Sequence, residues 1–118
     1  MKTTTIAFAL LSIMAILNAC QKTDRAIDAP CCIKQKIIKA MQEPVRNPPM
    51  SVWRYDFHEQ KVYYIPAQCC DFGSELYDKD CHFICSPDGG FSGCGDLQCT
   101  DFLSDRKNPE LIWEDNRR

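Results

Sequence analysis

The chain has 118 residues, with 14 Lys or Arg against 16 Asp or Glu, and a formal net charge of −2. This length suffices for one domain, and the absence of a basic stripe argues against nucleic acid as a partner. Nine residues are cysteine, and small exported domains often add covalent crosslinks to a modest core.

The first 19 residues have the zones of a signal peptide. Lys2 supplies a positive charge, and residues 6–17 form an apolar run with one serine. That run is shorter than the roughly 20 residues with which a helix spans a bilayer, whereas it has the length of a signal-peptide core. We therefore expect export, with removal of residues 1–19.

The apolar run ends in Leu17-Asn18-Ala19-Cys20, which resembles the lipobox of bacterial lipoproteins. The resemblance implies cleavage before Cys20 and a diacylglycerol on its thiol, and an anchor of two or more acyl chains is stable. Residues 20–30 would then be the anchor and tether, and the lipid on Cys20 would contact the membrane. The expected place is the cell envelope, with the outer membrane favoured and its periplasmic and surface faces both open. An ordinary secretory signal or a short buried helix is the alternative.

Once Cys20 is assigned to lipid, an even number of cysteines remains, which predicts a disulfide framework in an exported domain. These residues are Cys31, Cys32, Cys69, Cys70, Cys81, Cys85, Cys94 and Cys99. Their pairing cannot be read from spacing alone. Adjacent side chains point apart on a helix or a strand, so Cys31 and Cys32 are expected to have different partners, as are Cys69 and Cys70.

Residues 31–42 carry apolar side chains at helical spacing, with the lysines mostly away from that stripe. The pattern predicts an amphipathic helix that begins with a capping Asp28 and with Pro30 in the first turn, and that ends before Pro44.

The rest of the chain predicts a small antiparallel sheet. Alternation favours a hairpin from strands 51–57 and 62–65 around a turn at 58–61. A second hairpin (75–78 and 81–85), a glycine-rich loop (86–98), a helical turn (101–105) and a short strand (111–113) follow. The fold class is therefore α+β, with residues 31–118 as one domain in which the N-terminal helix packs on the disulfide-stapled sheet.

The first hairpin is rich in aromatic residues. Trp53, Tyr55 and Phe57 share one face of its first strand, and Tyr63 and Tyr64 lie on its second strand. Since all of them cannot occupy one face, some would be partly exposed, where aromatic residues mark partner or sugar sites. Core and cross-strand packing is the alternative that we favour. The possible binding surface comprises Trp53, Tyr55, Tyr63, Tyr64, Asp88 and Asp96.

Cysteine and histidine chemistry gives a weaker signal. A zinc site would use Cys81, His82 and Cys85 with Cys94 or Cys99, but the spacings are not the usual ones and an oxidising compartment favours bridges. His82 could activate Cys81 as a nucleophile, yet adjacent strand residues face apart. We therefore expect no catalytic residue.

The glycine-rich loop also has a structural explanation. It lacks the lysine and hydroxyl of a phosphate-binding loop, and the spacing of Asp88, Asp96 and Asp101 does not match the calcium loop. Glycines permit positive φ in a tight crosslinked turn. We therefore expect neither a metal nor a cofactor.

A string of short motifs runs along the domain. They are Asn47-Pro48-Pro49, Val52-Trp53-Arg54-Tyr55, Val62-Tyr63-Tyr64, Cys69-Cys70-Asp71, Leu76-Tyr77-Asp78, residues 84–90, Gly95-Asp96, Cys99 and Leu111-Ile112-Trp113. Together they resemble a family of short bacterial lipoproteins that carry a domain of unknown function. The resemblance implies one small exported domain and no known activity. Cys81 and Cys94 depart from the family pattern, which suggests that they pair with each other.

The expected function is that of a lipid-anchored, non-enzymatic envelope protein with a structural or binding role. A small inhibitor or ligand-binding protein that uses the glycine-rich loop or the hairpin is one alternative, and a thiol or metal enzyme is another. Beyond the membrane, the sequence identifies neither a protein nor a glycan partner, and it does not indicate the oligomeric state.

Overall fold

The computed structural model describes residues 27–69 and 71–118. Its elements are helix α2 (Cys31–Gln42), strands β1 (Ser51–Phe57), β2 (Gln60–Ile65), β3 (Glu75–Asp78) and β4 (Phe83–Cys85), helix α3 (Phe102–Asp105) and strand β5 (Lys107–Glu114). The expected signal peptide, Cys20 and Cys70 lie outside the described residues. Among the described residues, no helix has both the length and the apolar character needed to cross a membrane.

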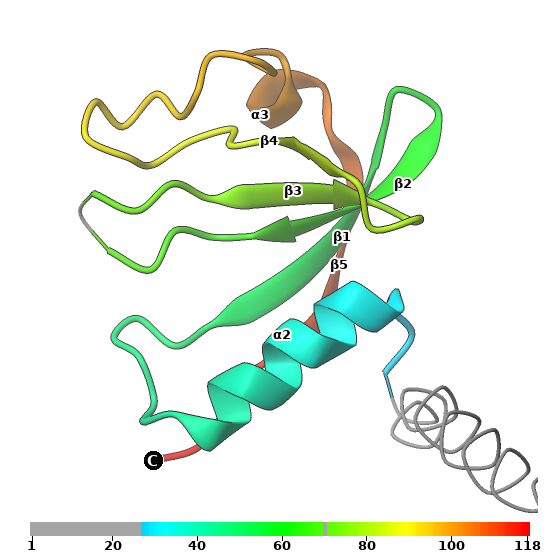
Figure 1. The fold of residues 1–118 in the computed structure, drawn as a ribbon. Helices are drawn as coiled ribbons and strands as arrows, with labels where there is room; N and C mark the ends of the chain where they lie inside the picture. Colours follow the sequence, from blue (N-terminus) through cyan, green and yellow to red (C-terminus); the bar gives the residue numbers. More distant parts are fainter. Residues whose placement is uncertain (1–26, 70) are drawn as a thin grey trace, which may run out of the picture.

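The strands form one antiparallel sheet in the order β4-β3-β2-β1-β5, and α2 runs along it (Figure 1). Strands β1 to β4 follow one another as neighbours, and β5 returns to pair with the free side of β1. The predicted α+β class, with one N-terminal helix on a small antiparallel sheet, is confirmed.

The hairpin β1–β2 closes through a two-residue turn. Phe57 pairs with Gln60, and the turn residues His58 and Glu59 have φ angles of 48° and 62°. Positive φ at both central residues is the signature of the type I′ turn, whose twist matches that of the flanking strands. The turn is therefore tighter than the expected 58–61, and β2 begins at Gln60.

Both faces of the sheet carry a hydrophobic core. The core beneath α2 consists of Ile33, Ile37, Ala40, Met50, Val52, Tyr63 and Ile65. The core on the opposite face consists of Tyr55, Phe57, Val62, Tyr64, Leu76, Cys85, Cys99 and Phe102. The ring of Phe102, which is fully buried, meets the rings of Tyr55 and Phe57 edge-on with centroids 5.7 and 5.3 Å apart. The short helix α3 thus covers the face that α2 leaves open.

Helix α2 spans the expected residues, but its start and its buried side differ from the prediction. Pro30 is the N-cap and no side chain caps the helix. The carboxylate of Asp28, the expected cap, accepts a hydrogen bond from Arg54 at 2.7 Å. Lys34 is only 9% exposed, so it does not lie away from the apolar stripe. A lysine stem can be buried along apolar surface in this way.

Strand β5 is longer than the expected 111–113. Its first half is polar and includes Pro109, so it shows no apolar alternation. An edge strand tolerates proline because one side of its backbone needs no partner. Side chains hold this half to β1: Arg54 contacts Glu110 at 2.7 Å, and Asn108 donates a hydrogen bond to Asp56.

Candidate functional site

The aromatic residues of the first hairpin are mostly part of the two cores. Tyr55, Tyr63 and Tyr64 are 8%, 6% and 7% exposed, and Trp53 is partly buried against the same core as Tyr55. Cross-strand packing explains this arrangement, since alternate residues of β1 and β2 face opposite cores. The three tyrosines are therefore core residues, which agrees with the packing alternative that the sequence analysis favoured, and they offer little exposed aromatic surface.

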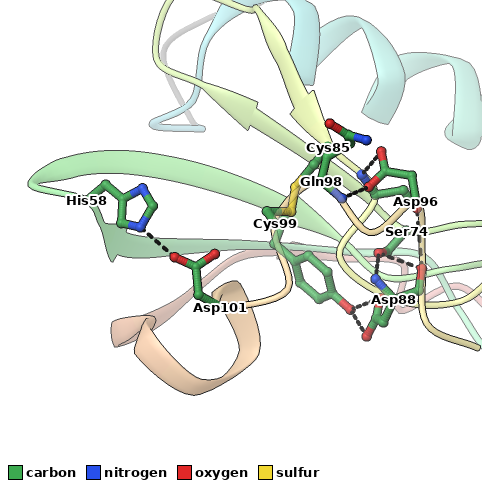
Figure 2. The surroundings of a disulfide bond; sticks show 10 residues. His58, Ser74, Cys85, Asp88, Asp96, Gln98, Cys99 and Asp101 are labelled. Carbon is green, nitrogen blue, oxygen red and sulfur yellow. Dashed lines mark hydrogen bonds and ion pairs between the residues drawn. A yellow bond between two sulfur atoms is a disulfide. The ribbon is translucent and has the colours of Figure 1, made fainter.

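The glycine-rich loop is held to the sheet through Asp88 (Figure 2). The hydroxyl of Tyr64 donates to the Asp88 carboxylate, with oxygen–oxygen distances of 2.8 and 2.9 Å. Burial, followed by the hydrogen bond to Asp88, raises the pKa of Tyr64, so its proton stays in place. The buried Ser74 hydroxyl accepts a hydrogen bond from the Asp88 backbone N–H and donates to the Asp88 carbonyl. Asp88 therefore has a structural role: it fixes the glycine-rich loop to the sheet.

The Asp96 carboxylate is occupied by hydrogen bonds within the same loop. Its carboxylate accepts hydrogen bonds from the backbone N–H groups of Ser86 and Gln98 at 2.9 and 3.0 Å. Asp101, the third carboxylate of the alternative calcium set, instead lies 2.7 Å from His58 Nε2. The three carboxylates thus serve three separate sets of partners, and no group of three or more potential metal ligands occurs within residues 27–69 and 71–118.

Two disulfides whose cysteines both lie in the described part of the chain crosslink the framework. Cys85 at the end of β4 is bonded to Cys99 just before α3, 14 residues on, which closes the glycine-rich loop. Cys32 of α2 is bonded to Cys81 in the turn between β3 and β4, 49 residues away. Cys31 is also disulfide-bonded, so it and Cys32 have different partners, as predicted. Cys69 is disulfide-bonded as well.

The suggested pairing of Cys81 with Cys94 is wrong. Cys81 is bonded to Cys32, whereas Cys94 is an exposed free cysteine. The reason is the position of the loop: its Asp88 is fixed on Tyr64, in the core opposite α2, while Cys81 joins the helix. The zinc alternative also fails, because the sulfurs of Cys81 and Cys85 are bonded to other cysteines and cannot serve as zinc ligands.

Neither described histidine faces a nucleophile. His58 stacks on Phe57 and contacts Asp101. His82 contacts Asp78, whose pKa is lowered mainly by the hydrogen bond from the His82 backbone N–H. With Cys81 oxidised, the alternative of a thiol activated by His82 has no free thiol to act upon.

A groove that the sequence analysis did not identify lies between the C-terminal half of α2 and the ends of β2 and β3. It encloses about 270 Å³, and its lining comes from two distant segments of the chain. Lys36, Lys39 and Arg46 come from the helix and the loop after it. Ile65 and Phe72 come from the chain around the β2–β3 connection. Because these segments meet only in the folded sheet, no local motif could have revealed the site.

The charges in this basic groove are unequal. Three cationic side chains and one carboxylate, that of Glu75, line it. Lys36 Nζ lies 3.3 Å from Glu75 Oε1 and 5.2 Å from the centre of the Tyr77 ring. Burial opposes the charge of Lys36, but the contacts with Tyr77 and Glu75 outweigh it, and the pKa of Lys36 is raised. The groove therefore has an excess of positive charge in a chain whose net charge is negative.

A second hollow, of about 580 Å³, lies beside the β1–β2 turn and α3. The polar groups there already bind one another. His58 contacts Asp101, Asn108 donates to Asp56, and the Ser104 hydroxyl contacts Asp105. The basic groove is the stronger candidate, because its cations exceed its carboxylates.

These features define a small disulfide-crosslinked α+β domain with a basic groove at one end of its sheet. The chain belongs to the family described as a domain of unknown function (DUF6970), whose model matches residues 38–115. The match includes every strand of the sheet, together with Lys39 and Arg46. No curated protein and no solved structure matches the chain.

Proposed function

We propose that this protein is a lipid-anchored, non-enzymatic binding module of the cell envelope. The observation that carries the proposal is the crosslinking of the domain by Cys32–Cys81 and Cys85–Cys99, because such bonds form and persist in oxidising compartments outside the cytoplasm. The lipobox-like Leu17-Asn18-Ala19-Cys20 supports anchoring through a diacylglycerol on Cys20, and the outer membrane is the proposed location.

A binding role suits a domain whose reactive groups are committed to its own structure. Asp88, Asp96 and Asp101 hold loops, and the two histidines contact Asp101 and Asp78. The basic groove, in contrast, has more cationic side chains than carboxylates in its lining. We assign binding to this groove, in place of the glycine-rich loop or the aromatic hairpin that the sequence suggested.

Replacing the lipid-bearing residue tests the anchor. We expect the wild-type chain to fractionate with the outer membrane and to have a mass that fits cleavage before Cys20 plus acylation. The Cys20→Ser variant should lose the lipid mass and leave the membrane fraction. Cys94→Ser, which also removes one thiol, is the matched control and should stay in the membrane. An unacylated wild-type chain in the soluble fraction would refute the anchor.

Protease treatment of intact cells separates the two faces of the membrane. A domain that is digested lies on the surface, and one that is protected until the outer membrane is opened faces the periplasm. Either result is compatible with the envelope location, whereas recovery of the unprocessed chain from the cytoplasm with its cysteines reduced would contradict it.

A further inference from the structure

The basic groove is lined by both apolar and charged side chains. Met50 and Ile65, which are 7% and 3% exposed, belong to the core beneath α2 and also line the groove, together with Pro66. Lys39 and Arg46 line it from α2 and from the loop that follows the helix. A ligand that satisfies both parts must carry an anionic group and an apolar body.

The cationic side chains that line the groove outnumber its one carboxylate, that of Glu75, by two. Glu75 accounts for Lys36 through their 3.3 Å contact. Arg46 has a looser contact, 3.9 Å, with Glu43, and no ion pair of Lys39 occurs in the described part of the chain. A phosphomonoester carries a charge of about −2 at neutral pH and several strong acceptor oxygens, which Lys and Arg donors bind through charge-assisted hydrogen bonds.

Size and shape limit the rest of the ligand. A volume of about 270 Å³ is at the lower end of ligand pockets, so the body is comparable to one ring or a short chain. Phe72, which is 64% exposed, also lines the groove and offers an aromatic ring. Gln68 adds an amide for a polar substituent.

The place of the groove in the domain separates it from the tether. The described chain begins at residue 27, next to the N-terminal end of α2, whereas the loops that line the groove lie toward the other end of the helix (Figure 1). A helix of 12 residues is about 18 Å long. The groove therefore lies away from the point at which the described chain begins.

We propose that the groove binds the phosphomonoester group of a small or polymer-borne ligand whose body is apolar, with Lys39 and Arg46 holding the phosphate and Phe72 contacting the body. The inference rests on the proposed function as a binding module. It does not depend on the lipid anchor, because every residue that it uses lies between 36 and 75.

Titration of the full-length chain with phenyl phosphate tests this site by calorimetry and by amide chemical shifts. Phenol lacks the charge and inorganic phosphate lacks the body, so each should bind about tenfold more weakly or worse. The shifts should cluster at residues 36–46 and 65–75. Lys39→Gln and Arg46→Gln should each weaken binding of phenyl phosphate about tenfold, and Phe72→Ser should weaken it less.

Lys79→Gln is the matched control. Lys79 is exposed in the turn between β3 and β4 and lines no part of the groove, so its loss should leave affinity unchanged. Near-UV circular dichroism checks that each variant is folded. Equal affinity for phenyl phosphate and phenol, or an equal loss in Lys79→Gln, overturns the proposal.

Two further arms separate the possible sources of the phosphate and the role of the anchor. The Cys20→Ser chain should bind phenyl phosphate as the wild type does, which makes failure of the anchor distinguishable from failure of the groove. The same chain should not bind phosphatidylglycerol vesicles. Vesicle binding that is lost in Lys39→Gln would overturn the assignment in favour of a lipid surface.

Discussion

Arg117 holds the end of α2 while Asp115 holds Arg117. The guanidinium lies 2.7 Å from the Asp115 carboxylate and donates hydrogen bonds to the carbonyl oxygens of Ala40, Met41 and Glu43 at 2.9–3.1 Å. The last carbonyls of a helix lack partners within the helix, and a cation there also complements the helix dipole. The C-terminal tail thus completes a helix more than 70 residues earlier in the chain.

Replacing Arg117 by methionine should lower the Tm by several degrees. The Arg117→Met change keeps the aliphatic stem but removes every donor, and it leaves the Asp115 side chain, which is 2% exposed, without its cation. Thermal unfolding followed by circular dichroism measures the effect. Arg118→Met, at the exposed neighbouring position, should leave the Tm unchanged, and a wild-type Tm in Arg117→Met would refute the capping role.

Acid should destabilise the domain in a defined direction. The pKa of Asp115 is lowered chiefly by hydrogen bonds from Arg117, and that of Asp56 chiefly by Lys61. A carboxyl whose pKa is lowered by folding stabilises the fold in full above its unfolded value, about 3.9, and loses that stabilisation as the pH falls through the folded value. The urea concentration at the midpoint of unfolding should therefore decrease as the pH is lowered below about 4.

The difference in urea midpoint between wild type and Asp115→Asn should also shrink on acidification, because protonation removes the same charge from the wild type. Urea midpoints measured from neutral to acidic pH provide the check. A difference that stays constant across this range would show that the Asp115 charge does not contribute.

Tyr64→Phe should cost about 1–3 kcal/mol of unfolding free energy, which is typical for a buried hydrogen bond to a charged group. The ring stays in the core, but the Asp88 carboxylate loses its hydrogen bond from the hydroxyl at 2.8 Å. The glycine-rich loop then loses one of its attachments to the sheet. Urea unfolding measures the loss. Tyr55→Phe is the matched control in the same core, because the Tyr55 hydroxyl makes no hydrogen bond within the described residues. An equal loss of unfolding free energy in the two variants would contradict a stabilising role for the Tyr64–Asp88 hydrogen bond.

Gly95→Ala should destabilise the loop far more than Gly90→Ala. Both residues have positive φ, 67° and 73°, so both variants carry the left-handed strain of about 1–2 kcal/mol. A Cβ at Gly95 would also overlap the backbone of Ser86 and Pro87, whereas one at Gly90 would meet nothing within 4 Å. Comparison of the two Tm values isolates the steric part, and similar values would argue against the close approach.

Removing the Cys85–Cys99 crosslink should cost about 3 kcal/mol, since the bond closes a loop of about 15 residues. The double variant Cys85→Ala with Cys99→Ala is compared with Cys94→Ser, whose thiol is free and exposed and whose stability should match the wild type. In the native protein, a thiol reagent should label Cys94 but none of Cys32, Cys81, Cys85 and Cys99 before reduction. Labelling of Cys81 without reductant would refute its bond to Cys32.

The periodic spacing of apolar residues in the sequence predicts the first helix and the first strand. Apolar spacing over 31–42 and alternation over 51–57 were sufficient for α2 and β1, because a helix and a strand each impose a period on the side chains that face a core. The same patterns said little about β5, where Pro109 and charged residues occupy an edge with few buried positions.

The sequence alone determined the class of the domain, its helix and main hairpin, and the need for crosslinks, because these depend on local periodicity and on the number of thiols. Only the tertiary structure decided that Cys81 joins Cys32, that Phe102 fills the second face of the sheet, and that Lys39 and Phe72 border one groove. Such pairings depend on which distant segments share a face of the sheet, and that is settled when both faces bury their apolar side chains together.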